Sequence, residues 1–174
     1  MHAGAAARLN VRGARPGDED ALLAVDRATW SPYSSPAPGP PEGPFFNERT
    51  EPENVLVAEL EGRIAGYGKI GHPTELPASA HVWYVSGLAV DPELEGRGAG
   101  RALMEALIEL ARERGGRRMT LRVFAPNERA RRLYERLGYR DAGIEPQRVR
   151  GTIMIRSGPL EVDDTLIYLV KDLA

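Results

Sequence analysis

A run of six residues, Glu95-Gly96-Arg97-Gly98-Ala99-Gly100, has the composition of a turn that binds phosphate. An apolar stretch ending at Leu88-Ala89-Val90 precedes the run, and an amphipathic stretch beginning at Arg101 follows it, so the order predicts a strand, a glycine-rich turn and a helix start. Glycines let the backbone approach an anion closely, and the free N–H groups of a helix's first turn point at that anion. These residues predict a phosphate-binding site; on the six residues alone, a tight turn without a ligand is the alternative.

A second segment, from Asn127 to Tyr139, predicts a short helix that a glycine ends. Asparagine is a residue type that caps helix starts, and a glycine such as Gly138 is typical of a helix end. The segment has the spacing Asn127-x-x-Ala130-x-x-x-Tyr134-x-x-x-Gly138-Tyr139.

Together, the apolar stretch, the glycine run and this spaced helix resemble the GCN5-related N-acetyltransferase (GNAT) family, most strongly from Val82 to Tyr139. The resemblance implies acetyl-CoA or another acyl-CoA as the acyl donor. It implies a primary amine as the usual acceptor, which would be a small molecule, an amino acid or a peptide N-terminus. We therefore expect an enzyme, an N-acetyltransferase; a CoA-binding sensor or regulatory module with little or no catalysis is the alternative.

The resemblance also implies roles for individual residues. The backbone amides of residues 96–101 would bind the CoA pyrophosphate, and Leu88 to Val90 would pair with the pantetheine arm like an added strand. Asn127 would cap its helix, contact the pantetheine arm, or do both, and Ala130 belongs to the same motif. A β-bulge expected at Gly87-Leu88 would open a slot beside the strand, and the N–H of Leu88 would stabilise the developing oxyanion.

Tyr134 is the candidate general acid, because its position matches the tyrosine that family members direct at the CoA sulfur. Its ordinary pKa of about 10 keeps the phenol protonated at neutral pH, and lies above a thiol pKa of about 8.5. Packing beside Leu133 and Leu137 is the alternative role for a tyrosine at this position.

Two positions depart from the family pattern. Glu95 stands where glutamine or arginine is usual, and we expect its side chain to point outward because the turn would bind through backbone N–H groups. No acid occurs between His81 and Val90, whereas many relatives place a glutamate near the position of Tyr84. His81 is a substitute candidate for the general base. Without a dedicated base, the site favours amines of low pKa, such as α-amino groups at about 7.7 to 8.0, over lysine-type amines at about 10.4.

Acceptor choice is expected to depend on the least family-like segments, Ser31–Phe46 and Ser157–Asp164. Between Ser31 and Pro44, six prolines and two glycines predict a loop. Six aromatic residues are candidates for an acceptor pocket, although core packing explains most of them equally well: Trp30, Tyr33, Phe45, Phe46, Trp83 and Tyr84. Four carboxylates are further candidates, with turn or surface positions as the alternative: Glu51, Glu53, Asp163 and Asp164.

Charge is divided unevenly along the chain. Residues 97–140 hold twelve arginines and five glutamates, a balance of +7, and the remainder holds eleven basic and twenty acidic residues, a balance of −9. The basic part suits a polyanionic cofactor, and the acidic remainder favours a cationic acceptor. Nucleic acid is the competing explanation of the arginines, but they alternate with glutamates as on solvated helix faces, so no nucleic acid partner is expected.

The chain has no cysteine, which excludes a thiolate nucleophile, a disulfide and a cysteine metal site, and it has three histidines. No metal is expected. Neither a continuous apolar signal segment near the N-terminus nor a run of about 18 apolar residues is present, so we expect a cytoplasmic chain without a membrane partner.

The predicted elements make one mixed α/β N-acetyltransferase domain over residues 1–174. The expected strands are 9–12, 55–60, 64–70, 81–90, 119–124, 151–155 and 164–170, and the expected helices are 16–30, 98–114 and 127–138. Because a helix joins strands 81–90 and 119–124, these two are expected to be parallel and to splay apart within an otherwise mostly antiparallel central sheet with flanking helices. The closing strands offer edges for a homodimer, which the sequence does not distinguish from a monomer.

Overall fold

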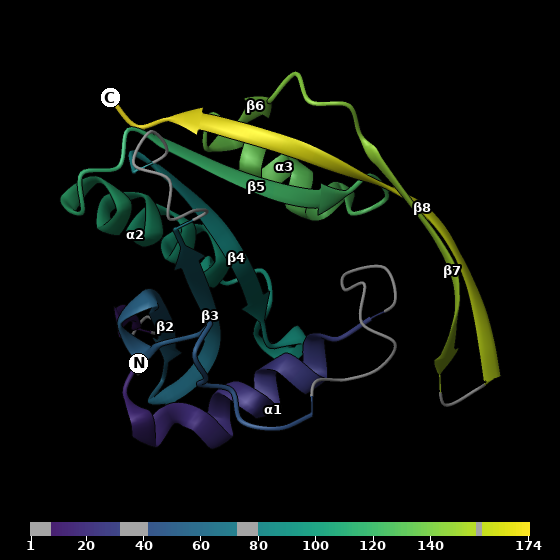
Figure 1. Ribbon diagram of the computed structural model, residues 1–174. Helices are drawn as coiled ribbons and strands as arrows, with labels where there is room; N and C mark the ends of the chain where they lie inside the picture. The colour runs from purple at the N-terminus through teal and green to yellow at the C-terminus, as the bar shows by residue number, and fades with distance from the viewer. Residues whose placement is uncertain (1–7, 32–41, 73–79, 156–157) are drawn as a thin grey trace, which may run out of the picture.

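A mixed sheet with the strand order β1-β2-β3-β4-β5-β8-β6 forms the centre of the computed structural model, and β7 pairs with β8 outside that order (Figure 1). The residues described are 8–31, 42–72, 80–155 and 158–174. The strands are β1 Leu9–Gly13, β2 Val55–Leu60, β3 Arg63–Gly71, β4 Val82–Val90, β5 Arg118–Phe124, β6 Arg140–Asp141, β7 Gln147–Ile155 and β8 Gly158–Asp172. The helices are α1 Glu19–Thr29, α2 Ala99–Glu113 and α3 Glu128–Arg136, with the short 3-10 turns η1 Pro16–Asp18, η2 Pro52–Asn54 and η4 Pro92–Leu94.

Pairing between β4 and β5 is parallel, and the other strand pairs are antiparallel. The predicted fold class, a mostly antiparallel α/β sheet with one parallel pair and flanking helices, is therefore confirmed. The loop predicted at Ser31–Pro44 falls mostly outside the described residues. In the part of the chain that is described, no helix is both long enough and apolar enough to cross a membrane.

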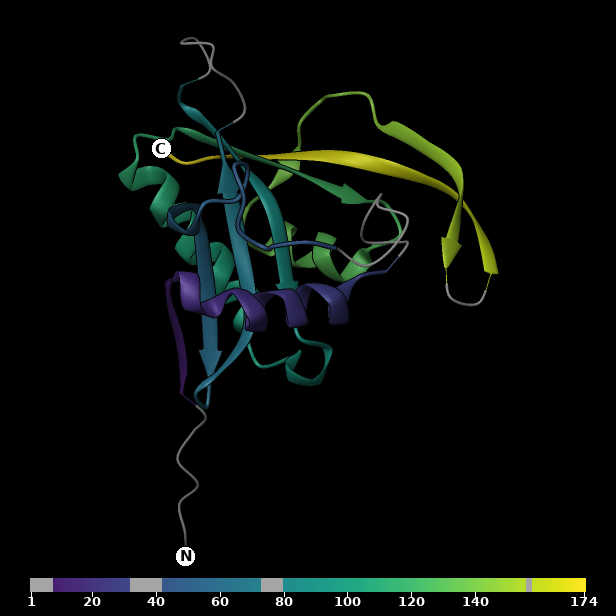
Figure 2. The ribbon, with the colours of Figure 1, turned by 60° about the horizontal axis from the view of Figure 1, so that its bottom comes forward.

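Helices cover both faces of the sheet, with α1 on one face and α2 and α3 on the other (Figures 1 and 2). Neighbouring residues of β3 illustrate this, because they face different helices. Tyr67 packs into the core cluster that contains Leu22 and Val25 of α1. The next residue, Gly68, faces α2, since a Cβ added there would lie 2.7 Å from Leu107 Cδ1. Successive strand residues point to opposite faces, so each face of β3 has its own helix.

The helix α2 anchors the sheet through an apolar stripe. Leu103, Met104 and Leu107 are fully buried, at 0% exposure. Leu103, Leu107 and Ile108 are buried, whereas Leu110 is only partly buried. The helix begins at Ala99, within the glycine run, with Gly98 as its N-cap.

The C-terminal strands extend further than the sequence predicted. Instead of 151–155 and 164–170, β7 and β8 pair continuously from Gln147↔Leu166 to Ile155↔Gly158, and the hairpin projects from the body of the molecule (Figure 1). The charged residues near Asp163 resemble a turn in sequence. In the hairpin, Arg148 and Arg150 bond to Asp163 across the strands, which is how charged residues stabilise a sheet. The two-residue strand β6 was not predicted.

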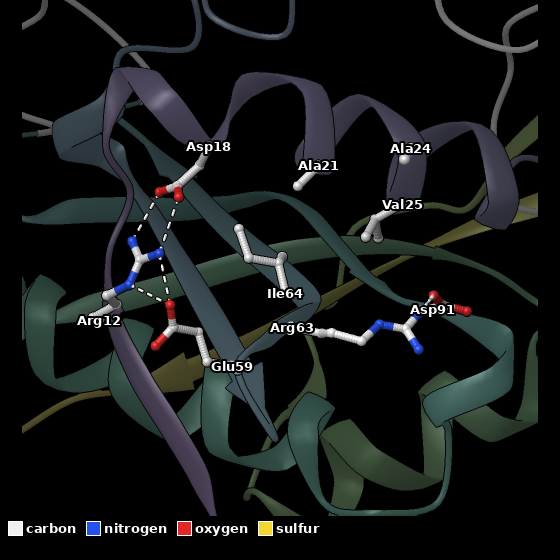
Figure 3. A pocket seen from close by; sticks show the side chains of 10 residues that line it. Arg12, Asp18, Ala21, Ala24, Val25, Glu59, Arg63, Ile64 and Asp91 are labelled. Atoms are coloured by element: carbon white, nitrogen blue, oxygen red, sulfur yellow. Dashed lines mark hydrogen bonds and ion pairs between the residues drawn. The ribbon is translucent and has the colours of Figure 1, made fainter.

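An ion-pair network joins β1, β2 and the start of α1 (Figure 3). Arg12 donates from both terminal nitrogens to Asp18, at 2.8 and 2.9 Å, and from Nε to Glu59 at 2.9 Å. The hydrogen bonds from Arg12 lower the pKa values of both carboxyl groups. Asp18 also accepts from the backbone N–H of Arg15 at 2.7 Å, so the same side chain orders the turn before α1.

Replacing Gly66 with alanine should destabilise the fold. A Cβ at Gly66 would lie 2.5 Å from the carbonyl oxygen of Ala89, and this neighbour is backbone that cannot rotate away. We expect the free energy of unfolding to fall by about 1–3 kcal/mol, the usual cost of overpacking. Urea unfolding followed by circular dichroism measures it. Gly13→Ala is the matched control, because nothing lies within 4 Å of that Cβ. An equal effect of both substitutions would contradict the close approach of β3 and β4.

Asp18→Asn should remove stability in a pH-dependent way. Asparagine can keep the hydrogen bond from Arg15 but loses the charged bond to Arg12, for which about 1.5–3 kcal/mol is typical. Because folding lowers the pKa of Asp18, its contribution is full above the unfolded pKa of about 4 and disappears as pH falls through the folded pKa. The stability gap between the wild type and the variant should therefore be present at pH 7 and shrink below about pH 4. Urea titrations at a series of pH values test this, and a gap independent of pH would refute it.

Candidate active site

Strand β4 separates from β5 after its first three residues. The parallel pairing runs only from Val82↔Arg118 to Tyr84↔Thr120, while β5 stays paired with β8 as far as Phe124. From Val85 onward, β4 therefore has no strand partner on its β5 side among the described residues. The sequence prediction that these two strands splay apart is confirmed.

A β-bulge lies at the point of separation. In the pairing with β3, Lys69 lies opposite Gly87 and Ile70 lies opposite Val85, so Ser86 is the extra residue. The bulge is thus one residue before the predicted position at Gly87-Leu88. The glycine has a different role, since a Cβ at Gly87 would lie 2.6 Å from Lys69 Cε. Gly87 is required for the close approach of a side chain from β3.

The backbone beyond the bulge points free groups into the gap. The N–H of Asp91 donates to the carbonyl oxygen of Ala65 on β3, at 2.7 Å. Because N–H directions alternate along a strand, the N–H groups of Leu88 and Val90 point away from β3, toward the side that β5 has left. This edge can accept an added extended chain.

The glycine run forms the entry to α2. Asp91 accepts from the N–H of Glu93 at 2.9 Å and starts the turn η4. Gly96 and Gly98 have φ angles of 76° and 87°, which L side chains adopt only with strain. Gly98 is the N-cap and supplies no side chain, so the N–H groups in the first turn of α2, at residues 99–101, are open to a ligand. The predicted phosphate-binding geometry, a strand end, a tight turn and a helix start, is present.

Helix α3 lies beside this turn. A Cβ at Gly100 would be 3.7 Å from both Val90 and Leu133, so the start of α2 contacts the end of β4 and the middle of α3. Glu95 forms an ion pair with Arg129 of α3. The Glu95 carboxylate is therefore directed at an arginine, and a negative charge near the turn is offset.

The two predicted residues of α3 have the expected local positions. Asn127 is the N-cap, and its Oδ1 accepts from the N–H of Ala130 at 3.2 Å. Tyr134 is 7% exposed and shares the core cluster of α2, with its ring 5.9 Å from that of Tyr139. Burial raises the pKa of Tyr134 to about 12, so the phenol is protonated throughout the physiological range. Among the described residues, its hydroxyl makes no hydrogen bond.

Several other candidates are not brought to the gap. His81 is exposed at the start of β4, where its carbonyl accepts from the N–H of Arg117, and about 20 Å of extended strand separates it from Leu88. Asp163 is held by Arg148 and Arg150, and the bonds from these arginines lower its pKa to about 2.

The candidate aromatic residues do not form one wall. Phe45 packs under α1, with its ring 4.9 Å from that of Tyr67. Trp83 lies on the other face, beside Gly116 at the end of α2. Tyr33 is outside the described residues.

A polar cluster on the α1 face was missed. Tyr67 donates its hydroxyl to Asp26 of α1, and Lys69 follows on the same face of β3. The sequence did offer one signal, a lysine within a strand rich in glycine and apolar residues. It did not indicate a contact with Asp26, which lies more than forty residues earlier.

A hollow of about 470 Å³ lies elsewhere, beneath α1 (Figure 3). Its charged lining residues pair with one another, as in Arg12–Asp18 and Arg63–Asp91. It includes neither the glycine run nor Tyr134, so it does not coincide with the gap beside β4. In the described ranges, no three His, Asp or Glu side chains gather as metal ligands would.

Comparisons with known proteins agree with this geometry. The chain is 37% identical over 98 residues to a mycothiol acetyltransferase of Clavibacter sepedonicus, a match covering 56% of this chain and 30% of that protein. It is 27% identical over 143 residues to a Bacillus subtilis protein named as a candidate ribosomal protein bS18-alanine N-acetyltransferase, covering 77% of this chain and 82% of that one. The chain thus spans less than a third of the first relative and most of the second.

A solved structure has the same fold. It is yncA of Salmonella typhimurium, described as a candidate acetyltransferase with its cofactor acetyl-CoA, and it superposes with a TM-score of 0.70 at 21% identity, covering 96% of this chain and 95% of that one. The model of the acetyltransferase (GNAT) family matches residues 22–139. Because this match covers more than half of the sequence, the chain belongs to the acetyltransferase (GNAT) family.

Proposed function

We propose that residues 1–174 act as one N-acetyltransferase domain that moves an acetyl group from acetyl-CoA to a primary amine. The observation that carries the proposal is the free edge of β4 beside the glycine-capped start of α2, with Tyr134 in the core cluster against which Leu88 packs. The names of relatives support acetyl transfer, and one of them names an alanine of ribosomal protein bS18.

The proposed donor site fits a long, phosphate-bearing thioester. The backbone N–H groups of residues 96–101 would hold the pyrophosphate, and Glu95 would stay on Arg129, outside the turn. The N–H and C=O groups of Leu88 and Val90 would pair with the amides of the pantetheine arm. Asn127 and Ala130 would lie along the same arm, and Ala89 would keep the strand edge in register with β3.

Acetyl-CoA would supply an activated acyl carbon and a thiolate leaving group. The N–H of Leu88 would stabilise negative charge on the acyl oxygen as the amine attacks. Tyr134 would donate a hydrogen bond or its proton to the departing sulfur. A phenol of pKa about 12 is a weak acid, so its main effect would be to stabilise the thiolate by hydrogen bonding.

The acceptor would have to arrive with little help from a base. Residues 82–90 contain no acid, and His81 lies at the far end of β4. Amines of low pKa, such as α-amino groups, suit this site because a larger fraction is neutral at pH 7. Several arginines of α2 and α3 pair with glutamates, as in Arg101–Glu105 and Arg132–Glu128, which supports solvated helix surfaces over a nucleic acid site. The C-terminal strands would offer edges for a homodimer, which the proposed reaction does not require.

Thiol release from acetyl-CoA in the presence of amines tests the proposed function. The panel should hold amino acids, amino acid amides, polyamines, aminoglycosides and short peptides, and a chain without cysteine adds no thiol background. We expect release that depends on one class of amine, with the acylated product confirmed by mass. Calorimetric binding of acetyl-CoA without release from any amine would favour a CoA-binding sensor instead.

Tyr134→Phe should lower kcat by up to about 10²-fold while leaving KM for acetyl-CoA nearly unchanged, because the phenol would act on the leaving group. The same assay should show that wild-type activity rises with pH as the acceptor amine loses its proton. It should show no loss from ionisation of Tyr134 below about pH 11, given its raised pKa. Full turnover in the variant would remove Tyr134 from the mechanism.

Gly98→Val should weaken CoA binding at least about 10-fold, because a branched side chain at this φ distorts the turn whose N–H groups would hold the pyrophosphate. Gly115→Val is the matched control, since Gly115 has a φ of 79° but lies at the other end of α2. Calorimetry with CoA measures the affinity. Urea unfolding should show that both variants lose a similar free energy of unfolding through backbone strain. Equal CoA affinity of the two variants would mean that the phosphate site is elsewhere.

A further inference from the structure

Lys69 occupies the α1 face of the sheet at the point where β4 leaves β5. It lies opposite Gly87 in the pairing of β3 with β4, next to the bulged Ser86. Its stem runs over Gly87, as the 2.6 Å approach of Cε to a Cβ at that position shows. One residue further along β4 is Leu88, whose N–H points into the gap. The lysine is therefore beside the place where the proposed reaction would occur.

The surroundings of Lys69 leave its charge without an anionic partner. Its Nζ lies 5.4 Å from the ring centre of Phe45 and 5.9 Å from that of Tyr67, and both rings favour the cation. The acid that raises its pKa is Asp26, whose carboxylate accepts a hydrogen bond from the hydroxyl of Tyr67. Among the described residues, Nζ makes no hydrogen bond and no ion pair. Burial lowers the pKa of Lys69 and Asp26 opposes this, as expected for a cation that has lost water and gained no counter-ion.

The proposed donor site and Lys69 lie on opposite faces of the sheet. The glycine run, α3 and Tyr134 all lie on the α2 face, where the donor would bind. Lys69 and its aromatic neighbours lie on the α1 face. Past Tyr84, no backbone pairing between β4 and β5 closes the sheet between the two faces. An amine reaching the thioester from the side that the donor does not cover would pass Lys69.

We propose that Lys69 is the anion-binding residue of the acceptor site and that the acceptor carries a carboxylate next to its amine, as an α-amino acid does. The inference rests on the proposed function. An acceptor carboxylate would supply the counter-ion that Lys69 lacks, and the attached amine would be held near Gly87 and Leu88. The lysine would repel acceptors with a second cation close to the reacting amine. A general base would instead act on any acceptor amine, with or without a carboxylate, so the two roles predict different acceptor preferences.

The decisive comparison pairs amino acids with their amides as acceptors for the wild-type protein. Amidation keeps the side chain and the amine, removes the carboxylate charge, and lowers the amine pKa. A preference for the free acid cannot therefore come from easier loss of the amine proton. We expect kcat/KM for the acids to exceed that for the amides by about 10- to 100-fold, the range for a hydrogen bond between charged groups.

Substitution at the lysine should then remove this preference. Lys69→Met keeps a stem over Gly87 and should lower kcat/KM for the acids by the same factor, mainly through KM, with little change for the amides or for KM of acetyl-CoA. Lys69→Arg keeps the charge and should retain the preference. Lys171 is the other lysine of the chain, on β8, so Lys171→Met is the matched control and should behave as wild type.

Three results would overturn the inference. Equal use of acids and amides by the wild type would do so alone, even if Lys69→Met failed to fold. An equal loss with both acceptor types in Lys69→Met, at an unchanged melting temperature, would indicate a general base or a packing role instead. Thiol release with no amine at all would overturn the proposed function and this inference with it, whereas release without a preference for acids overturns only the inference.

Discussion

The end of hydrogen bonding between β4 and β5 is the constraint on which the rest of the structure depends. Two parallel strands that begin paired at Val82↔Arg118 and part after Tyr84↔Thr120 leave a row of backbone donors and acceptors in the interior of the sheet. Unpaired backbone groups are costly when water is excluded, so such an edge is stable only if solvent or a bound chain satisfies it. After it leaves β4, strand β5 stays paired with β8, which bonds to it along its whole length, from Arg118↔Asp172 to Phe124↔Leu166.

The other elements hold the two sides of this parting at a fixed separation. The buried stripe of α2 ties β4 to β3, and small residues on β3 bring them close, as at Gly66 and Gly68. The start of α2 then falls at the end of β4, next to Leu133 of α3. Backbone N–H groups from a strand edge and from a helix start are thus aimed at one region without any charged side chain being needed to bind an anion.

Local patterns in the sequence were enough for the parts whose geometry is local. The glycine run, the capping Asn127 and the helix stripe of α2 each depend on residues within a few positions, and their elements are where they were predicted. The predicted position of the bulge was wrong by one residue, because the bulge at Ser86 arises from a register shift against Lys69 and Ile70, which lie on another strand. The predicted hairpin was too short, because Asp163 looked like a turn residue in the sequence but is paired across the strands by Arg148 and Arg150. Lys69 was missed because its position matters only through Asp26, Phe45 and Gly87, from three other segments.

The choice of basic residue has a consequence for a protein that is proposed to hold a reactive thioester. Of the twenty-three basic side chains, only Lys69 and Lys171 are lysines, and the rest are arginines. A guanidinium keeps its proton at any physiological pH and does not attack an acyl carbon, so positive charge near a thioester brings almost no risk of self-acylation. The lysine beside the gap is the exception: burial lowers its pKa, while Asp26 and the rings of Phe45 and Tyr67 favour its non-nucleophilic, protonated form. All twelve basic residues between 97 and 140 are arginines, so this positively charged part of the chain offers an acyl donor no lysine to modify.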